Sequence, residues 1–381
     1  TQARGVGGGP ANVITTLAKL ETGLPLYPMG AIGEDEYGAF ILKECSRLGL
    51  PTSGLITKTE VATAHTHVMS VAGQSRTFFY QGGANDTLNI NDFPEGTFKS
   101  TSARIFYLGY LTLLRNLDQI IDDNSTKAAQ VLKRAQNAGL VTCVDLVSIH
   151  HPEFSRIVEI AAPFVDFLIS NEIEAAKATG SRIDEETLTS AEALTQMAHR
   201  MLDLGVRKAV IIHCVERVVW MDANRDVFVI EVELVRPEEI ASNLGAGDAF
   251  CAGLLYGIHE RRGPERAIQQ GNAAAQYALG SMYWHGLCGV EKDTDRALEM
   301  YERAADQESA AALFALGKIY IDELVETVET DHDKGFDMLE QAADLGHPAA
   351  LYEVGTMYWQ GHGVEKNTRL GFDKLTQAAK M

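Results

Sequence analysis

Residues 243–258 read NLGAGDAFCAGLLYGI, a short glycine-rich turn that leads into an apolar helix pattern. Gly245 and Gly247 allow a tight turn, because glycine adopts backbone conformations that other residues avoid. The first N–H groups of a helix have no partner within the helix and point together, so a phosphate can bind there. The stretch therefore predicts an anion hole formed by the backbone of Gly245, Ala246 and Gly247.

Asp248 follows this turn and falls in the first turn of the expected helix, for which Asn243 is a suitable N-cap. A carboxylate at this position is favoured by the helix dipole. Beside a bound phosphate, it is placed to accept the proton of an attacking hydroxyl. Asp248 is therefore the candidate catalytic base, and the alternative is an Asp that merely caps a helix after a glycine turn.

The first ~265 residues alternate strand-like and helix-like segments, which indicates an α/β fold with a largely parallel sheet. The expected buried strands are 104–109, 140–145, 165–169 and 208–213, and the expected helices lie near 125–138, 153–162, 172–179 and 187–204. Residues 61–80 alternate differently and predict antiparallel strands that form a small β lid or edge extension.

Beyond residue ~265 the sequence becomes Ala-rich, helical and repetitive. QYALGSMYWHG at 276–286 recurs as LFALGKIYIDE at 313–323 and as LYEVGTMYWQG at 351–361. Gly280, Gly317 and Gly355 are 37 and 38 positions apart. A fixed period of this length with two helices per unit predicts an all-α solenoid of helix-pair repeats.

The bulk composition limits the classes of function. The formal charge of −19 argues against nonspecific binding to nucleic acid or to an anionic membrane surface. No apolar run reaches the ~18 residues that a membrane span needs, and no signal peptide opens the chain. The five cysteines are odd in number and form no C-x-x-C, so we expect reduced thiols and a cytoplasmic protein.

Four motifs in the α/β part resemble those of the PfkB/ribokinase family of carbohydrate kinases. G-A-G-D-A-F-x-A-G at 245–253 matches the second family signature, although the usual leading D-T is replaced by Asn243-Leu244. GVGGGPANVITTLAKL at 5–20 resembles the first signature, GAIGEDEYG at 30–38 matches G-x-x-G-x-D-x-x-G, and SNEIEA at 170–175 matches N-x-x-E. Family members begin with a strand before the first signature, so we expect this sequence to start inside the domain.

The resemblance implies a ribokinase-like sandwich that transfers the γ-phosphate of ATP to a sugar hydroxyl, with Mg²⁺ present. By position, Gly8, Gly9 and Asn12 match residues that touch the sugar in the family. Asn171 and Glu174 match residues that organise Mg²⁺ and the phosphates, largely through water. We interpret the motif at 30–38 as structural.

Other site residues are weaker candidates. Asp145 ends an expected strand, where α/β proteins place ligand-binding residues, and is a candidate for the sugar or an ordinary loop Asp. His213 stands where relatives carry the Thr of T-x-G-x-x-G beside the nucleotide, and neither glycine is present. Asn272 lies in A-x-x-x-G-N-A-A-A, a pattern that packs near the adenine in relatives.

The repeats resemble the Sel-one-like repeat, a relative of the tetratricopeptide repeat, with GVEKD at 289–293 and GVEKN at 363–367 as specific parts. Such repeats usually bind a protein partner, and a purely structural cap is the alternative. We expect a kinase domain at 1–270 and about three repeats at 271–381. One continuous helix across 271–279 is predicted to belong to both, because no Gly/Ser- or Pro-rich linker separates them.

Two other readings of the function stay open. The first is a kinase-fold scaffold with little or no catalysis, whose repeats bind a protein partner. The second is a PfkB-type kinase that acts on a nucleoside or a vitamin. The lid-like strands at 61–80 are in addition a candidate surface for a homodimer.

Overall fold

The computed structural model describes residues 5–69, 77–182, 188–232, 245–287, 290–322 and 330–381. The chain divides into two compact units. The sheet unit comprises Val6–Ala11 and Pro25–Leu234, and the helical unit comprises Thr1–Gly5, Asn12–Leu24 and Val235–Met381, in so far as these are described. Helix α1 (Gly9–Lys19) therefore begins in the sheet unit and ends in the helical unit.

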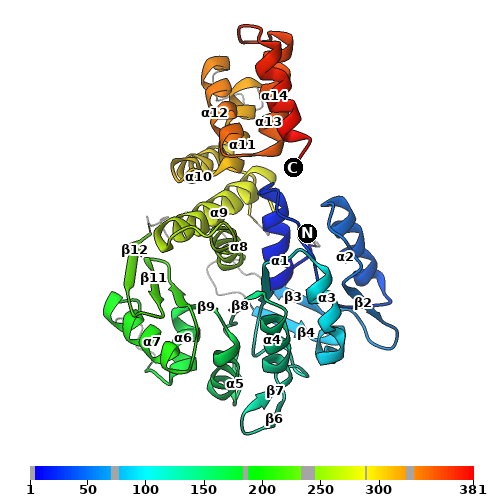
Figure 1. Ribbon diagram of the computed structural model, residues 1–381, viewed down its shortest axis with the longest axis vertical. Helices are drawn as coiled ribbons and strands as arrows, with labels where there is room; N and C mark the ends of the chain where they lie inside the picture. The colour runs from blue at the N-terminus through cyan, green and yellow to red at the C-terminus, as the bar shows by residue number, and fades with distance from the viewer. Residues whose placement is uncertain (1–4, 70–76, 183–187, 233–244, 288–289, 323–329) are drawn as a thin grey trace. The chain divides into compact units, whose positions relative to one another are not determined.

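The sheet unit is built on a six-stranded sheet (Figure 1). Its order is β12 (Val227–Glu231), β11 (Arg217–Asp222), β10 (Ala209–His213), β9 (Phe167–Asn171), β8 (Val141–Asp145) and β5 (Ile105–Leu108). Strands β5, β8, β9 and β10 are parallel, while β11 and β12 continue the sheet as antiparallel strands. The predicted α/β fold with a mostly parallel sheet is confirmed; β11 and β12 are strands that the sequence analysis did not predict.

The helices of this unit follow the predicted alternation closely. They are α4 (Lys127–Asn137), α5 (Phe154–Ala161), α6 (Glu172–Thr179) and α7 (Ala191–Asp203). Helix α4 packs on β5 and β8, α6 on β9 and β10, and α7 on β10 and β11. The strands carry near-continuous buried side chains, because helix packing on parallel strands removes their apolar residues from water.

Smaller elements complete the unit. The remaining strands are the parallel pair β1 (Gly30–Gly33) and β2 (Leu55–Lys58), and the antiparallel pairs β3 (His65–Met69) with β4 (Thr77–Gln81) and β6 (Ile120–Asp122) with β7 (Ser125–Thr126). The remaining helical turns are α2 (Glu36–Arg47), α3 (Glu95–Ser100), η1 (Gly83–Thr87), η2 (Ile90–Asp92) and η3 (Ala162–Phe164).

The motif at 30–38 has a structural role, which agrees with the interpretation of its sequence. Asp35 caps α2 by accepting the N–H of Gly38 at 2.8 Å, and it also accepts the Thr63 hydroxyl at 2.6 Å. Burial by itself raises the pKa of Asp35, but these hydrogen bonds and one from the Thr63 backbone outweigh it and hold that pKa below its usual value. A Cβ on Gly33 would lie 2.4 Å from the Val61 carbonyl oxygen, so that position has no room for a side chain.

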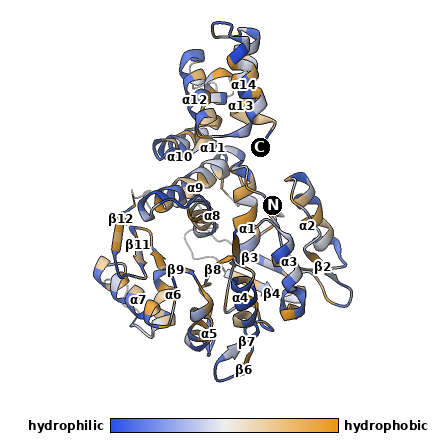
Figure 2. Ribbon diagram, viewed as in Figure 1, coloured by the Kyte–Doolittle hydropathy of each residue, from blue (hydrophilic) through white to orange (hydrophobic). Residues whose placement is uncertain are grey.

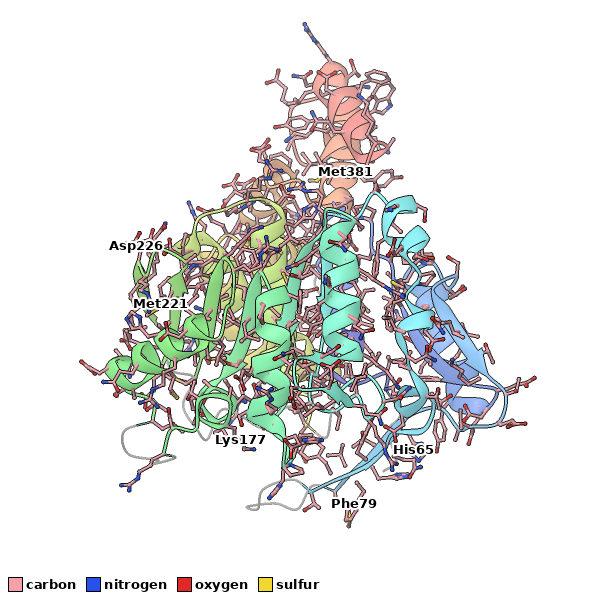
Figure 3. All side chains as sticks on the ribbon, turned by 60° about the horizontal axis from the view of Figure 1, so that its bottom comes forward. His65, Phe79, Lys177, Met221, Asp226 and Met381 are labelled. Atoms are coloured by element: carbon pink, nitrogen blue, oxygen red, sulfur yellow. The ribbon has the colours of Figure 1, made fainter. Side chains whose placement is uncertain are left out.

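The predicted antiparallel strands within 61–80 are confirmed as the β3–β4 hairpin, and residues 70–76 lie outside the described part of the chain. Figure 3 labels His65 on β3 and Phe79 on β4. The hairpin exposes several large apolar side chains, namely Val68, Met69, Phe78, Phe79 and Tyr80. A two-stranded sheet with such a surface has the character of a lid or of an interface.

The helical unit contains α8 (Ala246–His259) and α9 (Pro264–His285) besides part of α1. Helices α8 and α9 pack on each other through glycines and alanines of both. Helix α9 runs without a break through 271–279, which confirms the predicted continuous helix. The predicted domain boundary at 270/271 falls inside this helix and stays a proposal.

The repeats form successive helix pairs. The pairs are the C-terminal part of α9 with α10 (Thr294–Asp306), α11 (Ala310–Ile321) with α12 (His332–Asp344), and α13 (Pro348–Gln360) with α14 (Thr368–Ala378). The recurrent glycine of each pair permits close packing: a Cβ on Gly317 would lie 2.9 Å from the Gly335 carbonyl oxygen, and one on Gly355 2.9 Å from Leu375 Cγ. Figure 2 shows more hydrophilic residues on α10 than on α11, whose sequence is mostly apolar.

A buried histidine lies at the start of α13. His347 is the N-cap of α13, and its Nδ1 accepts the Ala350 N–H at 3.3 Å, which only an unprotonated Nδ1 can do. Its Nε2 lies 3.7 Å from Glu21 Oε2, a contact that favours the charged ring, but burial dominates and lowers the pKa of His347 to about 4. The ring is therefore neutral at pH 7.

We expect the chain to lose stability as the pH falls from about 6.5 to about 4, because the unfolded histidine takes up a proton in that window and the folded one does not. The loss is roughly 3 kcal/mol at pH 4, at about 1.4 kcal/mol per pH unit. Burial raises the pKa of Glu21, which offsets part of this loss, since the folded carboxyl gains its proton more readily than the unfolded one.

The matched variant is His347→Ser, because Ser309 caps α11 at the equivalent position without a titrating group. Urea unfolding at pH 7 and pH 4.5 should show a smaller acid loss in His347→Ser than in the wild type. Equal acid losses in the two proteins would contradict the assignment.

Two further expectations from the sequence concern the state of the cysteines and the presence of membrane-spanning helices. The described cysteines, Cys45, Cys143, Cys214 and Cys251, are free thiols, as expected, and Cys288 lies outside the described residues. Within the described ranges, no helix combines the length and the apolar character that crossing a bilayer requires.

Candidate functional site

Helix α8 begins directly after a glycine, where the sequence predicted an anion hole, and that role stays a prediction. Gly245 is the residue before the helix and has φ of 83°, a left-handed conformation that favours glycine. The first intrahelical hydrogen bond joins the Ala249 N–H to the Gly245 carbonyl at 2.8 Å, so the amides of residues 246–248 precede the helical ladder. The predicted N-cap, Asn243, lies outside the described residues; the described N-cap is Gly245.

The candidate base is held by a residue that lies far away in the sequence. Asp248 is in the first turn of α8 and is only 7 % exposed. The side-chain amide of Asn12, on α1, donates to Asp248 Oδ2 at 2.7 Å. This hydrogen bond restricts the orientation of the carboxyl group. The predicted contact of Asn12 with the sugar stays a prediction, and its contact with Asp248 is an additional finding.

Gly8 and Gly9 of the first signature cannot be replaced by larger residues without strain, for two different reasons. Gly8 has φ of 86°, where a side chain is strained. A Cβ on Gly9 would lie 2.4 Å from Tyr110 Cε1, so the tyrosine ring occupies the space of a side chain. Both positions therefore demand glycine within the sheet unit, and their predicted role in sugar binding remains a prediction.

Asp145 ends β8, as the sequence predicted, and it is 7 % exposed. The hydroxyl of Tyr107, on the neighbouring strand β5, donates to Asp145 Oδ2 at 3.3 Å. The sequence analysis missed Tyr107 and Tyr110, the first and last residues of YLGY at 107–110. Their position could have identified them, because both lie at the carboxyl end of a parallel strand, where side chains from adjacent strands converge.

Asn171 and Glu174 form a complete capping box at the start of α6. Asn171 Oδ1 accepts the Glu174 N–H at 2.8 Å, and Glu174 Oε2 accepts the Asn171 N–H at 2.9 Å. The hydroxyl of Ser148, which the sequence analysis missed, donates to Glu174 Oε1 at 2.8 Å. These bonds bring the two predicted residues together and order the carboxylate.

Glu174 is 5 % exposed, and burial raises its pKa, although hydrogen bonds from the Asn171 backbone and Ser148 act in the opposite direction. Both of its oxygens already accept hydrogen bonds. A carboxyl group in this state fits a role toward Mg²⁺ through water better than direct ligation. In the part of the chain that the structure describes, no cluster of three or more His, Cys, Asp or Glu residues forms a metal site.

The two residues proposed for the nucleotide are in separate elements. His213 ends β10, which turns at Cys214 into β11 through a hydrogen bond from the Cys214 N–H to the Arg217 carbonyl. Burial lowers the pKa of His213 to about 4, so the ring is neutral at pH 7 and offers hydrogen bonds without positive charge. Asn272 is a half-buried residue of α9. Neither nucleotide role is tested by this geometry.

Two family profiles match the chain. The profile described as "pfkB family carbohydrate kinase" matches residues 1–284. The profile described as "Sel1 repeat" matches three times, at 273–309, 310–347 and 348–381. The two profiles overlap at 273–284, inside the continuous helix α9.

Individual relatives are distant. A 5-dehydro-2-deoxygluconokinase of Geobacillus kaustophilus is 25% identical over 290 residues, which cover 72% of this chain and 79% of the relative. Among solved structures, Arabidopsis thaliana ribokinase complexed with ribose and ATP has a TM-score of 0.57 at 20% identity, covering 79% of this chain and 90% of its own. Anopheles gambiae adenosine kinase has a TM-score of 0.58 at 22% identity, covering 72% and 80%. At these identities the structural likeness shows the fold alone.

Proposed function

Because the chain belongs to the pfkB family of carbohydrate kinases and carries three Sel1 repeats, we propose that it is an ATP-dependent sugar kinase with Asp248 as catalytic base. The observation that carries the proposal is the start of α8. There a buried carboxylate, held by Asn12, sits in the same helical turn as the amides that precede the intrahelical hydrogen bonds.

In the proposed reaction Asp248 removes the proton of one sugar hydroxyl as its oxygen attacks the γ-phosphorus of ATP. The bond from that phosphorus to the β,γ-bridging oxygen breaks, and ADP leaves. The N–H groups of Gly245, Ala246 and Gly247 would hold the charge on the transferred group, which is how helix N-termini stabilise phosphates. Gly8, Gly9, Asn12 and Asp145 are the proposed contacts of the sugar, and the Asn12 amide in addition orients the base through its hydrogen bond to Asp248.

Mg²⁺, when bound, would neutralise charge on the phosphates. The residues proposed to act toward it are Asn171 and Glu174, through water, because the carboxyl of Glu174 is buried and fully hydrogen-bonded. His213 and Asn272 are the proposed contacts of the nucleotide.

The Glu174→Gln variant should need a higher Mg²⁺ concentration for half-maximal rate, because a carboxylate that orders metal-bound water has been neutralised. Gln at this position keeps the capping box, so the helix start is preserved. Glu172→Gln, two residues earlier in the same helix turn, is the control and should leave the titration unchanged. Identical Mg²⁺ titrations for wild type and Glu174→Gln would show that Glu174 has no role toward Mg²⁺ and serves only to cap the helix.

The chemical class of the sugar is open to direct test. Several relatives are named 5-dehydro-2-deoxygluconokinase, so a keto-deoxy sugar acid belongs in the first substrate panel. The experiment is an ADP-release assay with Mg·ATP over sugars, sugar acids, nucleosides and vitamins. ADP release with a sugar or sugar acid supports the proposal. Release with a nucleoside or vitamin alone would show a PfkB-type kinase that acts on that compound instead of on a sugar.

A scaffold function is the other candidate, and one observation favours it. The segment at 211–219 carries His213 in place of the Thr and lacks both glycines of T-x-G-x-x-G, so this nucleotide motif is incomplete in the sequence. In that reading the Sel1 repeats carry the function by binding a protein. Absence of ADP release across the whole panel would favour it.

The apolar surface of the β3–β4 hairpin supports the proposal of a homodimer through the lid. Phe78 and Phe79 are each more than half exposed in the single chain. The proposal includes a cytoplasmic location, which the free thiols support.

A further inference from the structure

Helix α1 contacts both the candidate base and the third repeat, all of which belong to the helical unit. Asn12, near the start of α1, donates from its side-chain amide to Asp248 Oδ2 at 2.7 Å. The same amide nitrogen lies 3.8 Å from the position that a Cβ on Gly245 would take, so Asn12 lies beside the residue that precedes α8 as well. The other end of α1 meets the third repeat through Glu21, which follows the helix.

Glu21 takes part in capping α13. Its carboxylate accepts the N–H of Ala349, the second residue of α13, which has no partner within that helix. Its Oε2 also lies 3.7 Å from His347 Nε2. Because Nδ1 of His347 accepts the Ala350 N–H, the neutral ring carries its proton on Nε2, on the side of Glu21. A carboxylate is favoured at a helix N-terminus, so these contacts hold Glu21 in place.

The backbone at Glu21 is in a conformation that favours glycine. Its φ is 47°, in the left-handed region. Helices α6, α9 and α13 end in the same region with a glycine each, at Gly180, Gly286 and Gly361. Glutamate is strained where glycine is not, and its side-chain contacts with the start of α13 supply a reason for its presence.

Backbone hydrogen bonds join Glu21 to the helix that carries Asn12. The Leu20 N–H donates to the Thr16 carbonyl at 2.9 Å. The Glu21 N–H donates to the Ala18 carbonyl at 3.3 Å, so the bonded turns of α1 continue to this residue. Asn12 and Glu21 are nine positions apart, about 14 Å along a helix. A helix of this length moves as one body, so a shift at Glu21 reaches Asn12.

We infer that Glu21 is a positioning residue for the proposed base: it holds the end of α1 on the third repeat, and α1 holds the Asn12 amide on Asp248. The placement of a reacting group strongly affects rate, and a displacement of about 1 Å can cost ~10²-fold. The third repeat thus serves the kinase reaction itself, besides any protein that the repeats bind. The inference rests on the proposed kinase function, because it concerns the turnover that Asp248 supports.

The test uses the full chain with two substitutions at position 21. Glu21→Gly removes the carboxylate and suits the left-handed backbone, so its effect does not come from backbone strain. Glu21→Gln keeps an oxygen that can accept the Ala349 N–H, and it is the conservative variant. Glu308→Gly is the matched control, because Glu308 has φ of 60° and its carboxylate pairs with Arg266 of α9 at 2.8 Å.

Steady-state kinetics use Mg·ATP and the sugar that the panel identifies. Glu21→Gly should lower kcat roughly 5-fold or more with an unchanged KM for ATP, because the base loses its orientation and the nucleotide contacts stay. Glu21→Gln and Glu308→Gly should both stay within about twofold of the wild type.

A double-mutant cycle separates this role from a general loss of structure. If Glu21 acts through the Asn12 amide, adding Glu21→Gly to Asn12→Ala should lower kcat little further, since the hydrogen bond that Glu21 supports is already gone. Independent effects would instead multiply.

Hydrogen exchange gives a readout that needs no kinase activity. Mass spectrometry of peptides from α1 and from the start of α13 should show faster exchange in Glu21→Gly than in the wild type, because these contacts no longer hold the two segments. The same peptides of Glu308→Gly should exchange like those of the wild type. Thermal melting confirms that all variants are folded.

Three kinetic results would overturn the inference: a Glu21→Gly enzyme with the kcat of the wild type, equal losses in Glu21→Gly and Glu308→Gly, or losses that multiply in the double variant. Unchanged exchange in α1 would overturn it as well, because Glu21 would then not hold the helix. A wild type that turns over no compound of the panel is a separate outcome, which removes the proposed function and with it the role of Glu21 in turnover.

Discussion

The Asp248→Asn variant should turn over at least ~10²-fold more slowly than the wild type, while its affinity for ATP changes little. Asn has nearly the shape of Asp and can still accept the amide of Asn12, but it is not a base. Loss of a general base typically costs 10²–10⁴-fold. Steady-state kinetics with Mg·ATP and the sugar identified by the panel measure kcat, and nucleotide titration measures ATP binding.

The control for this prediction is Asn12→Ala, which keeps the carboxylate of Asp248 and removes the Asn12 amide that donates to it. Its loss of kcat should be smaller than that of Asp248→Asn. An Asp248→Asn enzyme within a few-fold of the wild type would remove Asp248 from the mechanism, whatever the behaviour of Asn12→Ala.

Gly253→Ala should destabilise the chain by about 2 kcal/mol or more, a large effect for one methyl group. A Cβ on Gly253, in the middle of α8, would lie 2.1 Å from the backbone oxygen of Gln270 on α9. Backbone atoms cannot rotate away, so the two helices must separate. This outweighs the gain of about 1 kcal/mol from replacing a helical glycine by alanine. Urea unfolding of the two proteins measures the difference.

Gly96 provides the comparison, because it also lies in a helix, α3, and a Cβ there would meet nothing within 4 Å. Gly96→Ala should leave the free energy of unfolding unchanged or raise it. If Gly253→Ala unfolds at the same urea concentration as the wild type, the close approach of α8 and α9 is not what makes this position glycine.

Four strands of the central sheet were predicted from the sequence, and two were not. The strands β5, β8, β9 and β10 are apolar runs of the length of a buried strand, so they were predicted within a few residues. The strands β11 and β12 were missed. Residues 211–219, which include the start of β11, were interpreted only as a departure from a nucleotide motif, and residues 227–231 were assigned to no element. An antiparallel extension of a sheet depends on pairing between strands. This pairing cannot be predicted from the sequence of one strand alone.

The sequence by itself determined that an acidic residue follows a glycine turn at a helix start, that Asn171 and Glu174 stand three residues apart in N-x-x-E, and that the C-terminal part repeats. Each of these depends on residues that are close in the chain, where spacing directly dictates geometry.

Only the tertiary structure decided the rest. It placed Asn12 on Asp248 across 236 residues, Tyr107 on Asp145, and the Gln270 backbone against Gly253. The physical reason is the same in each case: the partner comes from a distant segment, and packing of whole elements, rather than local spacing, brings the two side chains or backbones together.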